Sequence, residues 1–300
     1  MYRVVPLCCA LALVLPVRAH AYDWPVKPFG VQHPVRGYFD DPRRETRPDG
    51  RMQESFHSGI DISAPDGTAV YAIEPGRVSL RRSAVVVTSA GGHVFGYWHI
   101  RPAVFRGTYV FRHQFIGWIE SGRGHVHLSE SVAGVYLNPL RPHALAPYAD
   151  QTPPTVADAF LSAHGAPVDL SAVGGTVDLI AEAFDTPPLS PPPPFAQTRV
   201  TPALIRWRVV GLDGRIVIEW RTAIDFREHL LPSPLFAQVY APGTLQNHAN
   251  RPGDYRFYLA RGWNTAAVPD GLYLLQIEAF DTRGNHGFRQ LPFRIANQSL

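Results

Sequence analysis

Cysteine is almost absent from this sequence: Cys8 and Cys9 are the only two, and both lie near the start of the chain. The stretch around them begins with one positive charge, continues with a nearly all-apolar run at 4–17, and reaches a small-x-small pattern, Ala-His-Ala, at 19–21. This order predicts a secretory signal peptide over residues 1–21. The exported chain would then contain no cysteine, so any metal must be held by histidine and carboxylate ligands.

Long apolar runs and a strong net charge are also lacking. Beyond residue 21 no segment reaches about 18 apolar residues, which excludes an ordinary transmembrane helix. Without the two arginines of residues 1–21, the 28 basic residues become 26 against 25 acidic ones, a net charge of +1. Such a balance argues against a nucleic-acid-binding protein. We expect an exported protein of the periplasm or cell envelope, or a secreted one.

The chain is poor in stretches that favour helices, because 29 prolines and 25 glycines interrupt its 300 residues. Both residue types break helix interiors, so an all-helical bundle is excluded. Turn dipeptides such as Asp66-Gly67 and Gly91-Gly92 instead separate short alternating runs, a pattern typical of antiparallel strands. The expected strands are 68–73, 77–80, 84–88, 94–100, 176–184, 203–210, 215–220, 255–261, 272–280 and 287–295.

These runs predict an all-β protein of two domains. After the signal peptide we expect a compact antiparallel β domain at 22–148. A linker at 149–170, helical or irregular, leads to a second domain at 171–300, where about six short strands suit an immunoglobulin-like β-sandwich. The second domain could recruit a protein partner or position the first.

The residues that carry chemistry are histidines of the first domain. His57 and Asp61 flank a turn-capable glycine, and His125 and His127 are two residues apart, so in a strand both would point to the same face. Two imidazoles and a carboxylate are a standard ligand set for zinc, which in catalytic sites keeps a fourth position for water. We therefore expect His57, Asp61 and one member of the His125/His127 pair to bind a metal, and the other to act as general base or oxyanion donor.

The arrangement resembles the lysostaphin-type (LytM-domain) zinc endopeptidases, which cut peptide bonds in bacterial peptidoglycan. Their pattern is His-x3-Asp followed by His-x-His, and the similarity extends over roughly residues 30–140. Supporting pieces are His33-Pro34, the stretch FHSGIDISAPDGTAVYA at 56–72 and Tyr-Trp-His-Ile at 97–100. The resemblance implies that His57, Asp61 and His127 bind one Zn²⁺ per chain, and that His99 and His125 form the catalytic pair.

Three positions depart from the family pattern. Ser129 stands where the family usually has a glutamate that could support the metal ligands from outside, and Glu130 follows one residue later. The loop before His-x-His is shortened to residues 120–124, which could reshape the substrate cleft. Trp98, where glycine is common, could narrow it. The resemblance therefore does not extend to substrate specificity.

The function that the resemblance implies is hydrolysis of peptidoglycan peptide bonds by zinc-activated water. One alternative is a non-catalytic module of the same fold that binds peptidoglycan or regulates a hydrolase. Another is a peptidase that acts on a protein. Asp185 and Asp281 could suggest calcium between sandwich strands, but we interpret them as turn residues because no calcium-type loop accompanies them. The arginines at 43, 44, 81 and 82 are interpreted as a solvated face.

Overall fold

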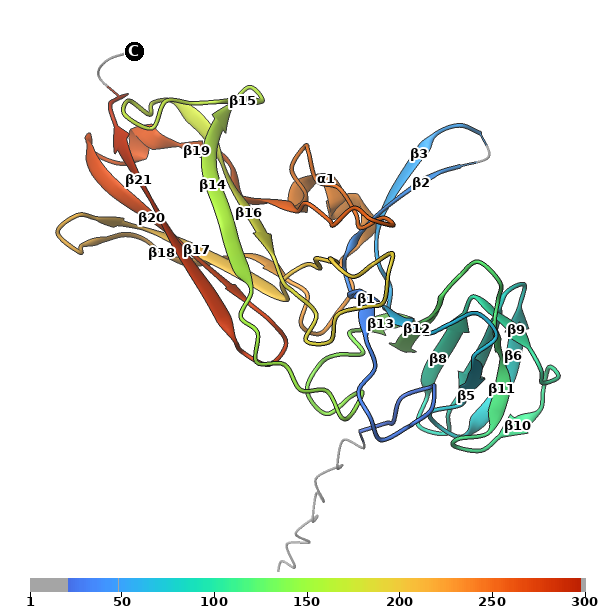
Figure 1. Ribbon diagram of the computed structural model, residues 1–300. Helices are drawn as coiled ribbons and strands as arrows, with labels where there is room; N and C mark the ends of the chain where they lie inside the picture. Colours follow the sequence, from blue (N-terminus) through green and yellow to red (C-terminus); the bar gives the residue numbers. More distant parts are fainter. Residues whose placement is uncertain (1–20, 48, 298–300) are drawn as a thin grey trace, which may run out of the picture.

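The computed structural model describes residues 21–47 and 49–297 (Figure 1). The predicted signal peptide, with both cysteines, lies outside the described residues except for residue 21. Regular structure in the described part is nearly all strand, which confirms the all-β fold class. The short helical segments are η1 (Ser233–Leu235), α1 (Phe236–Val239) and η2 (Thr265–Ala267). No helix among the described residues is long and apolar enough to cross a bilayer.

An eight-stranded antiparallel sheet forms the centre of the first unit, drawn in blue to green in Figure 1. Its order is β1-β4-β12-β8-β7-β6-β10, with β13 beside β12. The bounds are β1 (Val35–Gly37), β4 (Ile60–Ser63), β6 (Gly76–Arg81), β7 (Ala84–Thr88), β8 (His93–Trp98), β10 (Tyr109–Val110), β12 (His125–Val132) and β13 (Val135–Leu137). Within this sheet, the alternation of apolar side chains along each strand decides which face is buried.

Two smaller sheets complete the first unit. The three-stranded sheet β5-β11-β9 contains β5 (Ala69–Tyr71), β9 (Ile100–Pro102) and β11 (Phe115–Ile119). It packs with the large sheet around a core that includes Ile60, Tyr97 and Val126. The hairpin of β2 (Pro42–Thr46) and β3 (Met52–Phe56) extends away from both sheets, and its base lies near α1 (Figure 1).

The second unit consists of two four-stranded antiparallel sheets around one core. One has the order β15-β14-β16-β19, and the other the order β18-β17-β20-β21. The bounds are β14 (Thr155–Ala163), β15 (Ala166–Pro167), β16 (Thr176–Phe184), β17 (Leu204–Gly211), β18 (Ile216–Asp225), β19 (Arg256–Asn264), β20 (Gly271–Phe280) and β21 (His286–Ile295). The immunoglobulin-like topology and the domain limits stay predictions.

The expected linker contains a strand, which corrects its interpretation as a helical or irregular connector. β14 pairs along its length with β16, and it buries Val156, Ala159 and Leu161 in the core of the second unit. The sequence pattern was misleading because the prolines at 153–154 directly precede the strand. Proline is tolerated just before a strand and breaks only its interior.

The two units share residues across their junction. Phe56, at the end of β3, places its ring among Phe226, Phe236 and Tyr240 of the second core, and Val200 lies in the core of the first unit. Backbone hydrogen bonds also join β13 and the residue that follows it to residues 228–230. The junction therefore fixes the second unit directly beside β2, β3 and the residues that follow them.

Candidate metal centre

Two neighbouring strands bring the His-x3-Asp and His-x-His motifs together. β4 and β12 pair antiparallel with Asp61 opposite His127, and His57 enters from the turn between β3 and β4. Gly59 makes this approach possible: a Cβ there would lie 2.2 Å from the Leu128 carbonyl oxygen and 2.9 Å from the His127 ring. The glycine is therefore required by the close passage of the turn over β12.

Three ligand atoms converge on one point. His57 Nε2 lies 2.7 Å from His127 Nδ1 and 3.2 Å from Asp61 Oδ1, and the last two atoms are 3.1 Å apart. Tetrahedral zinc, with bonds of about 2.0–2.2 Å, separates its ligand atoms by roughly 3.3 Å. A shift of a few tenths of an ångström would open the cluster to that size. The chemistry and the spacing of the donor set thus fit zinc.

A carbonyl group on the far side of His57 selects the tautomer that a metal needs. Its Nδ1 donates a hydrogen bond to the Tyr38 carbonyl oxygen at 2.7 Å, which leaves Nε2 without a proton and directed at Asp61 and His127. In other proteins, a hydrogen bond from the ring nitrogen that does not bind the metal orients metal-binding imidazoles in the same way. The same backbone segment therefore holds the ring in place and sets its chemistry.

Burial and nearby charge fix the protonation states at neutral pH. Burial, with the Arg43 charge, lowers the pKa of His57 to about 3, so the ring is neutral. Burial raises the pKa of Asp61, but interactions with His57, His127 and Arg43 outweigh this effect, and the pKa lies well below its ordinary range. A neutral imidazole beside an ionised carboxylate is the form that binds a divalent cation.

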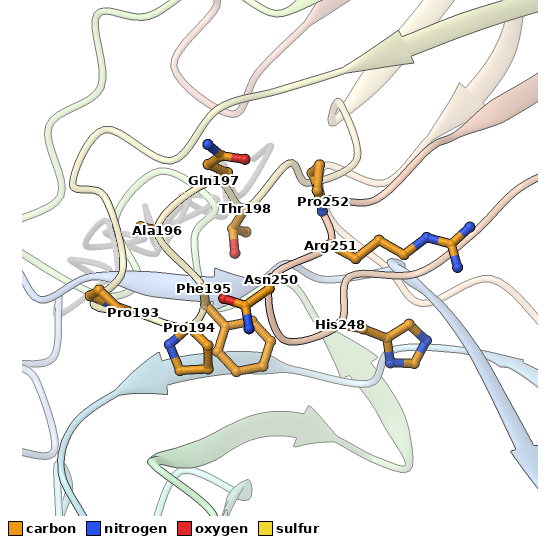
Figure 2. Close-up of a pocket in the computed structure, with 10 residues that line it drawn as sticks. All are labelled: Pro193, Pro194, Phe195, Ala196, Gln197, Thr198, His248, Asn250, Arg251 and Pro252. Atoms are coloured by element: carbon orange, nitrogen blue, oxygen red, sulfur yellow. The ribbon is translucent and has the colours of Figure 1, made fainter.

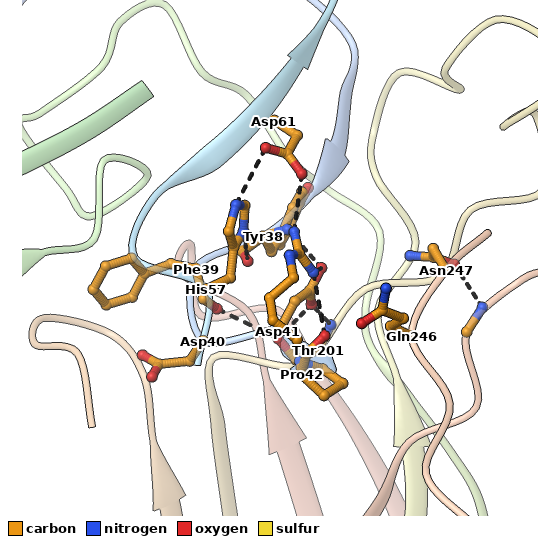
Figure 3. A network of polar contacts seen from close by, with 12 residues as sticks. Tyr38, Phe39, Asp40, Asp41, Pro42, His57, Asp61, Thr201, Gln246 and Asn247 are labelled. Atoms are coloured by element: carbon orange, nitrogen blue, oxygen red, sulfur yellow. Dashed lines mark hydrogen bonds and ion pairs between the residues drawn. The ribbon is translucent and has the colours of Figure 1, made fainter. Parts of the chain in front are cut away.

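A chain of polar contacts links Asp61 to the second unit (Figure 3). Arg43 Nη2 donates to Asp61 Oδ2 at 2.9 Å, which leaves Oδ1 facing the histidines, and Arg43 Nη1 lies 3.8 Å from Asp41. Asp41 Oδ1 accepts hydrogen bonds from the backbone N–H and the hydroxyl of Thr201, both at 3.0 Å. Arg43 therefore orients a candidate ligand, which corrects its interpretation as part of a solvated face.

His99 and His125 lie beside the three ligand atoms. Their ring centroids are 4.7 Å apart, and His125 Nε2 is 3.5 Å from Asp61 Oδ1. Burial, and then the neighbouring His125, lowers the pKa of His99 to about 4; burial also lowers the pKa of His125. Both rings are neutral near pH 7, so each can accept a proton or donate one hydrogen bond.

Arg36 contacts His125, although no sequence motif singled it out. Its Nη2 lies 2.6 Å from His125 Nδ1, and the Arg123 carbonyl oxygen lies 2.7 Å from the same nitrogen. One contact needs Nδ1 to be bare and the other needs it to carry hydrogen, so the two hydrogen bonds belong to opposite tautomers. The environment of His125 thus supports both the base and the donor form of the ring.

The residues that depart from the family pattern lie on both faces of β12. Ser129 shares the face of His127, where its hydroxyl accepts a hydrogen bond from the Trp98 indole at 3.2 Å. Glu130 points to the opposite face, is fully buried, and accepts hydrogen bonds from Arg141 and Tyr22. Glu130 therefore anchors the back of the strand and does not contact the candidate ligands.

A second group of acids also lies at the junction of the units. Ligand oxygens of Asp150, Asp185 and Asp281 are all within 4.8 Å of one another, and the three side chains are buried. Asp281 accepts hydrogen bonds from the backbone N–H groups of Arg283 and Asn285, as a turn residue does. The interpretation of Asp281 as a turn residue thus agrees with its local hydrogen bonds. The close approach of the three aspartates arises only from the tertiary fold.

Comparison with known proteins identifies the domain type. Residues 55–139 match the model of Peptidase family M23. No curated protein matches the chain. Similar solved structures include a zinc-containing peptidase from Vibrio cholerae, with 24% identity and a TM-score of 0.32 over 40% of this chain and 39% of that one. They also include Csd3 from Helicobacter pylori, with 21% identity, a TM-score of 0.32, and coverage of 40% and 34%.

A third similar structure is the catalytic domain, in a mutant form, of the prophage-encoded M23 protein EnpA from Enterococcus faecalis. It has 25% identity and a TM-score of 0.28 over 36% of this chain and 88% of that domain. This chain spans about two fifths of the Vibrio cholerae peptidase, so these partial likenesses do not extend to substrates or partners. Residues 55–139, which carry both histidine motifs, are a domain of Peptidase family M23, as the LytM-type resemblance led us to expect.

Proposed function

We propose that this protein is a zinc-dependent endopeptidase that hydrolyses peptide bonds of bacterial peptidoglycan. In this proposal His57, Asp61 and His127 hold one Zn²⁺, and His99 and His125 are the catalytic pair. The observation that carries it is the convergence of three ligand atoms, 2.7–3.2 Å apart, beside two further neutral imidazoles. The M23 domain supports a metallopeptidase, and export to the periplasm or cell envelope would bring it to this substrate.

The side chains divide the chemistry between them. Zinc, when bound, supplies Lewis acidity that polarises a carbonyl and acidifies water. Asp61 keeps one oxygen toward the metal position because Arg43 holds the other. His125 or His99, neutral before reaction, accepts the proton released as water adds to the scissile carbonyl, and the other ring donates a hydrogen bond to the oxyanion. The proton then passes to the leaving amine.

Two substitutions separate metal binding from turnover. We expect His127→Ala to lose both stoichiometric zinc and activity, because it removes a ligand. His125→Ala should keep zinc and lose about 10²–10⁴-fold in kcat, the usual contribution of a general acid or base. Metal analysis gives the zinc content, and mass spectrometry identifies the fragments released from purified peptidoglycan by the zinc-loaded chain.

The matched control is His286→Ala, which removes an exposed histidine of the second unit and should change neither reading. New peptide ends that are released by the native chain but not by His127→Ala would establish an endopeptidase and identify the peptide bond that it cuts. Stoichiometric zinc without release of fragments would instead support a binding or regulatory module, or a protein substrate. Zinc loss in His125→Ala, or activity in His127→Ala, would contradict the assigned roles.

A further inference from the structure

A pocket of about 320 Å³ opens on the second unit, outside the M23 segment (Figure 2). It lies between the proline-rich loop at 193–198 and the hairpin at 248–252. A backbone hydrogen bond from Asn250 N–H to the Pro194 carbonyl oxygen joins the two walls. This volume is in the range of pockets that bind small ligands or short peptide segments.

The pocket lies close to the proposed catalytic pair. Phe195, one of its lining residues, has its ring against the guanidinium of Arg36, with 4.2 Å from the guanidinium carbon to the ring centroid. Arg36 Nη2 is in turn 2.6 Å from His125 Nδ1. One ring and one guanidinium therefore separate the pocket from His125, so a substrate that extends from the metal centre over Arg36 reaches it.

The polar side chains of the pocket are free to bind a ligand. Among the described residues, the side chains of Gln197, Asn250 and Arg251 make no hydrogen bond or ion pair with other protein groups. Thr198 is only 5% exposed, and its buried hydroxyl has no hydrogen-bond partner. Figure 2 shows this hydroxyl directed between the two loops. An unpaired buried hydroxyl costs free energy that a bound polar group would offset.

The charge of the pocket favours an anionic partner. No aspartate or glutamate is among the lining residues. Arg251, on the wall at 248–252, carries a permanent positive charge, and its side chain extends from that wall away from the proline-rich loop (Figure 2). Asn250 and Gln197 offer amide groups of the kind that pair with peptide backbone, and Phe195 with the prolines supplies apolar surface. A planar guanidinium binds carboxylates in a paired, charge-assisted geometry.

We propose that this pocket is a substrate subsite that binds a carboxylate-bearing part of the peptide cut at the metal centre. The inference rests on the proposed endopeptidase function. Arg251 pairs with the carboxylate, Asn250 binds the peptide backbone, and Phe195 contacts the apolar part. The second unit thereby contributes directly to substrate recognition, beyond the fold of the M23 domain.

The test compares two synthetic peptides by calorimetry on the full chain. One is a peptidoglycan stem tetrapeptide with free carboxylates, and the other is the same peptide with every carboxylate converted to carboxamide. We expect the native chain to bind the first at least about tenfold more tightly, in line with one charge-assisted pair. Arg251→Gln should bring this ratio near one. Asn250→Ala should weaken both peptides by a similar factor and keep the ratio.

Arg294→Gln is the matched control, because this arginine is exposed on β21 and its side chain makes no hydrogen bond or ion pair with other described groups. The ratio is measured with zinc present and after its removal with EDTA, so it does not depend on activity. Equal affinity for both peptides, or an equal effect of Arg294→Gln, would overturn the subsite even if peptidoglycan is cleaved. Weaker binding of peptide-free glycan strands by Arg251→Gln would also overturn it. Selective peptide binding without any cleavage would keep the subsite and reject the endopeptidase.

Discussion

At the scale of single residues, the candidate metal centre depends on groups that orient its histidines and its carboxylate without being ligands themselves. Tyr38 fixes the tautomer of His57 through its carbonyl oxygen, and Arg43 occupies one oxygen of Asp61. Arg36 competes with the Arg123 carbonyl for the same nitrogen of His125. The reactivity of the histidines is thus set by neighbours that hold each ring in one orientation.

Gly59 is the residue whose replacement should disturb the centre most directly. In Gly59→Ala the new methyl group would meet the backbone oxygen of Leu128 at 2.2 Å, so the turn or β12 must move. We expect a loss of about 1–3 kcal/mol in the free energy of unfolding, as for other overpacked sites. Zinc affinity should fall at least about tenfold, because His57 and His127 would be displaced.

Urea unfolding and competition with a zinc-binding dye measure the two effects. Gly30→Ala serves as the control, since a Cβ at that position meets no atom within 4 Å. Unchanged zinc affinity in Gly59→Ala would show that the turn can move without carrying the ligands, contrary to the geometry described above.

At the scale of elements, β12 separates two tasks on its two faces. His125, His127 and Ser129 point toward the candidate centre, whereas Val126 and Leu128 pack in the core of the first unit. Alternation along a strand produces this division without any special backbone geometry. Glu130 lies one residue after the position where the family usually has its glutamate. It therefore points to the opposite face of β12, where it stabilises the strand.

Glu130→Gln tests this division. Glu130 is fully buried and receives two hydrogen bonds from Arg141, at 2.6 and 2.8 Å. Burial raises the pKa of Glu130, but the hydrogen bonds and charge of Arg141 outweigh this effect, and the pKa lies below its ordinary value. Breaking such a pair should cost about 3–5 kcal/mol at pH 7. Zinc affinity should stay unchanged.

The stability difference between the native chain and Glu130→Gln should depend on pH. A lowered carboxyl pKa stabilises the fold above the unfolded value of about 4.3, and this contribution is lost as the pH falls through the folded value. Urea unfolding should therefore show a large difference in the free energy of unfolding between the native chain and Glu130→Gln at pH 7, and a small difference at pH 3. Glu219→Gln, at an exposed site on β18, is the control. Zinc loss in Glu130→Gln would instead assign the glutamate to the metal site.

At the scale of the whole molecule, the junction between the units carries buried charge as well as apolar contacts. Asp41 binds Thr201 across the junction, and Asp150 and Asp185 lie together beside it with Asp281. Burial, and then the neighbouring Asp150, raises the pKa of Asp185 well above its ordinary value. The docking of the second unit should therefore respond to pH.

Asp185→Asn should show this response. The folded chain holds a proton on Asp185 that the unfolded chain releases above about pH 3.9, so ionisation lowers stability as the pH rises toward the folded pKa. Because asparagine cannot ionise, the Asp185→Asn variant does not lose stability in this way as the pH rises. In the presence of EDTA, the Tm of Asp185→Asn relative to the native chain should be a few degrees higher at pH 7.5 than at pH 4. Differential scanning calorimetry measures both values.

Asp49→Asn, at an exposed turn, is the control and should show no such dependence. A Tm difference that is the same at both pH values would show that folding does not raise the pKa of Asp185. A difference that falls at pH 7.5 would show that the folded chain favours the ionised carboxylate.

Most of the strands, and His57, Asp61 and one member of the His125/His127 pair as candidate ligands, could be predicted from the order of residues alone, whereas the choice of His127 came from the family resemblance. Alternating side chains located β7 and β16 to the residue, because a period of two reports which face is buried. The spacing of the four motif residues, His57, Asp61, His125 and His127, was informative because each pair acts within one turn or strand.

The remaining features depend on contacts between distant parts of the chain. They are the strand at 155–163, the roles of Arg36 and Arg43, the acid group at the junction and the pocket beside Phe195. Asp41 and Thr201, for example, are 160 positions apart. Contacts at such separations leave no periodic signal in the chain, so they become visible only once the sheets have packed and the two units have met.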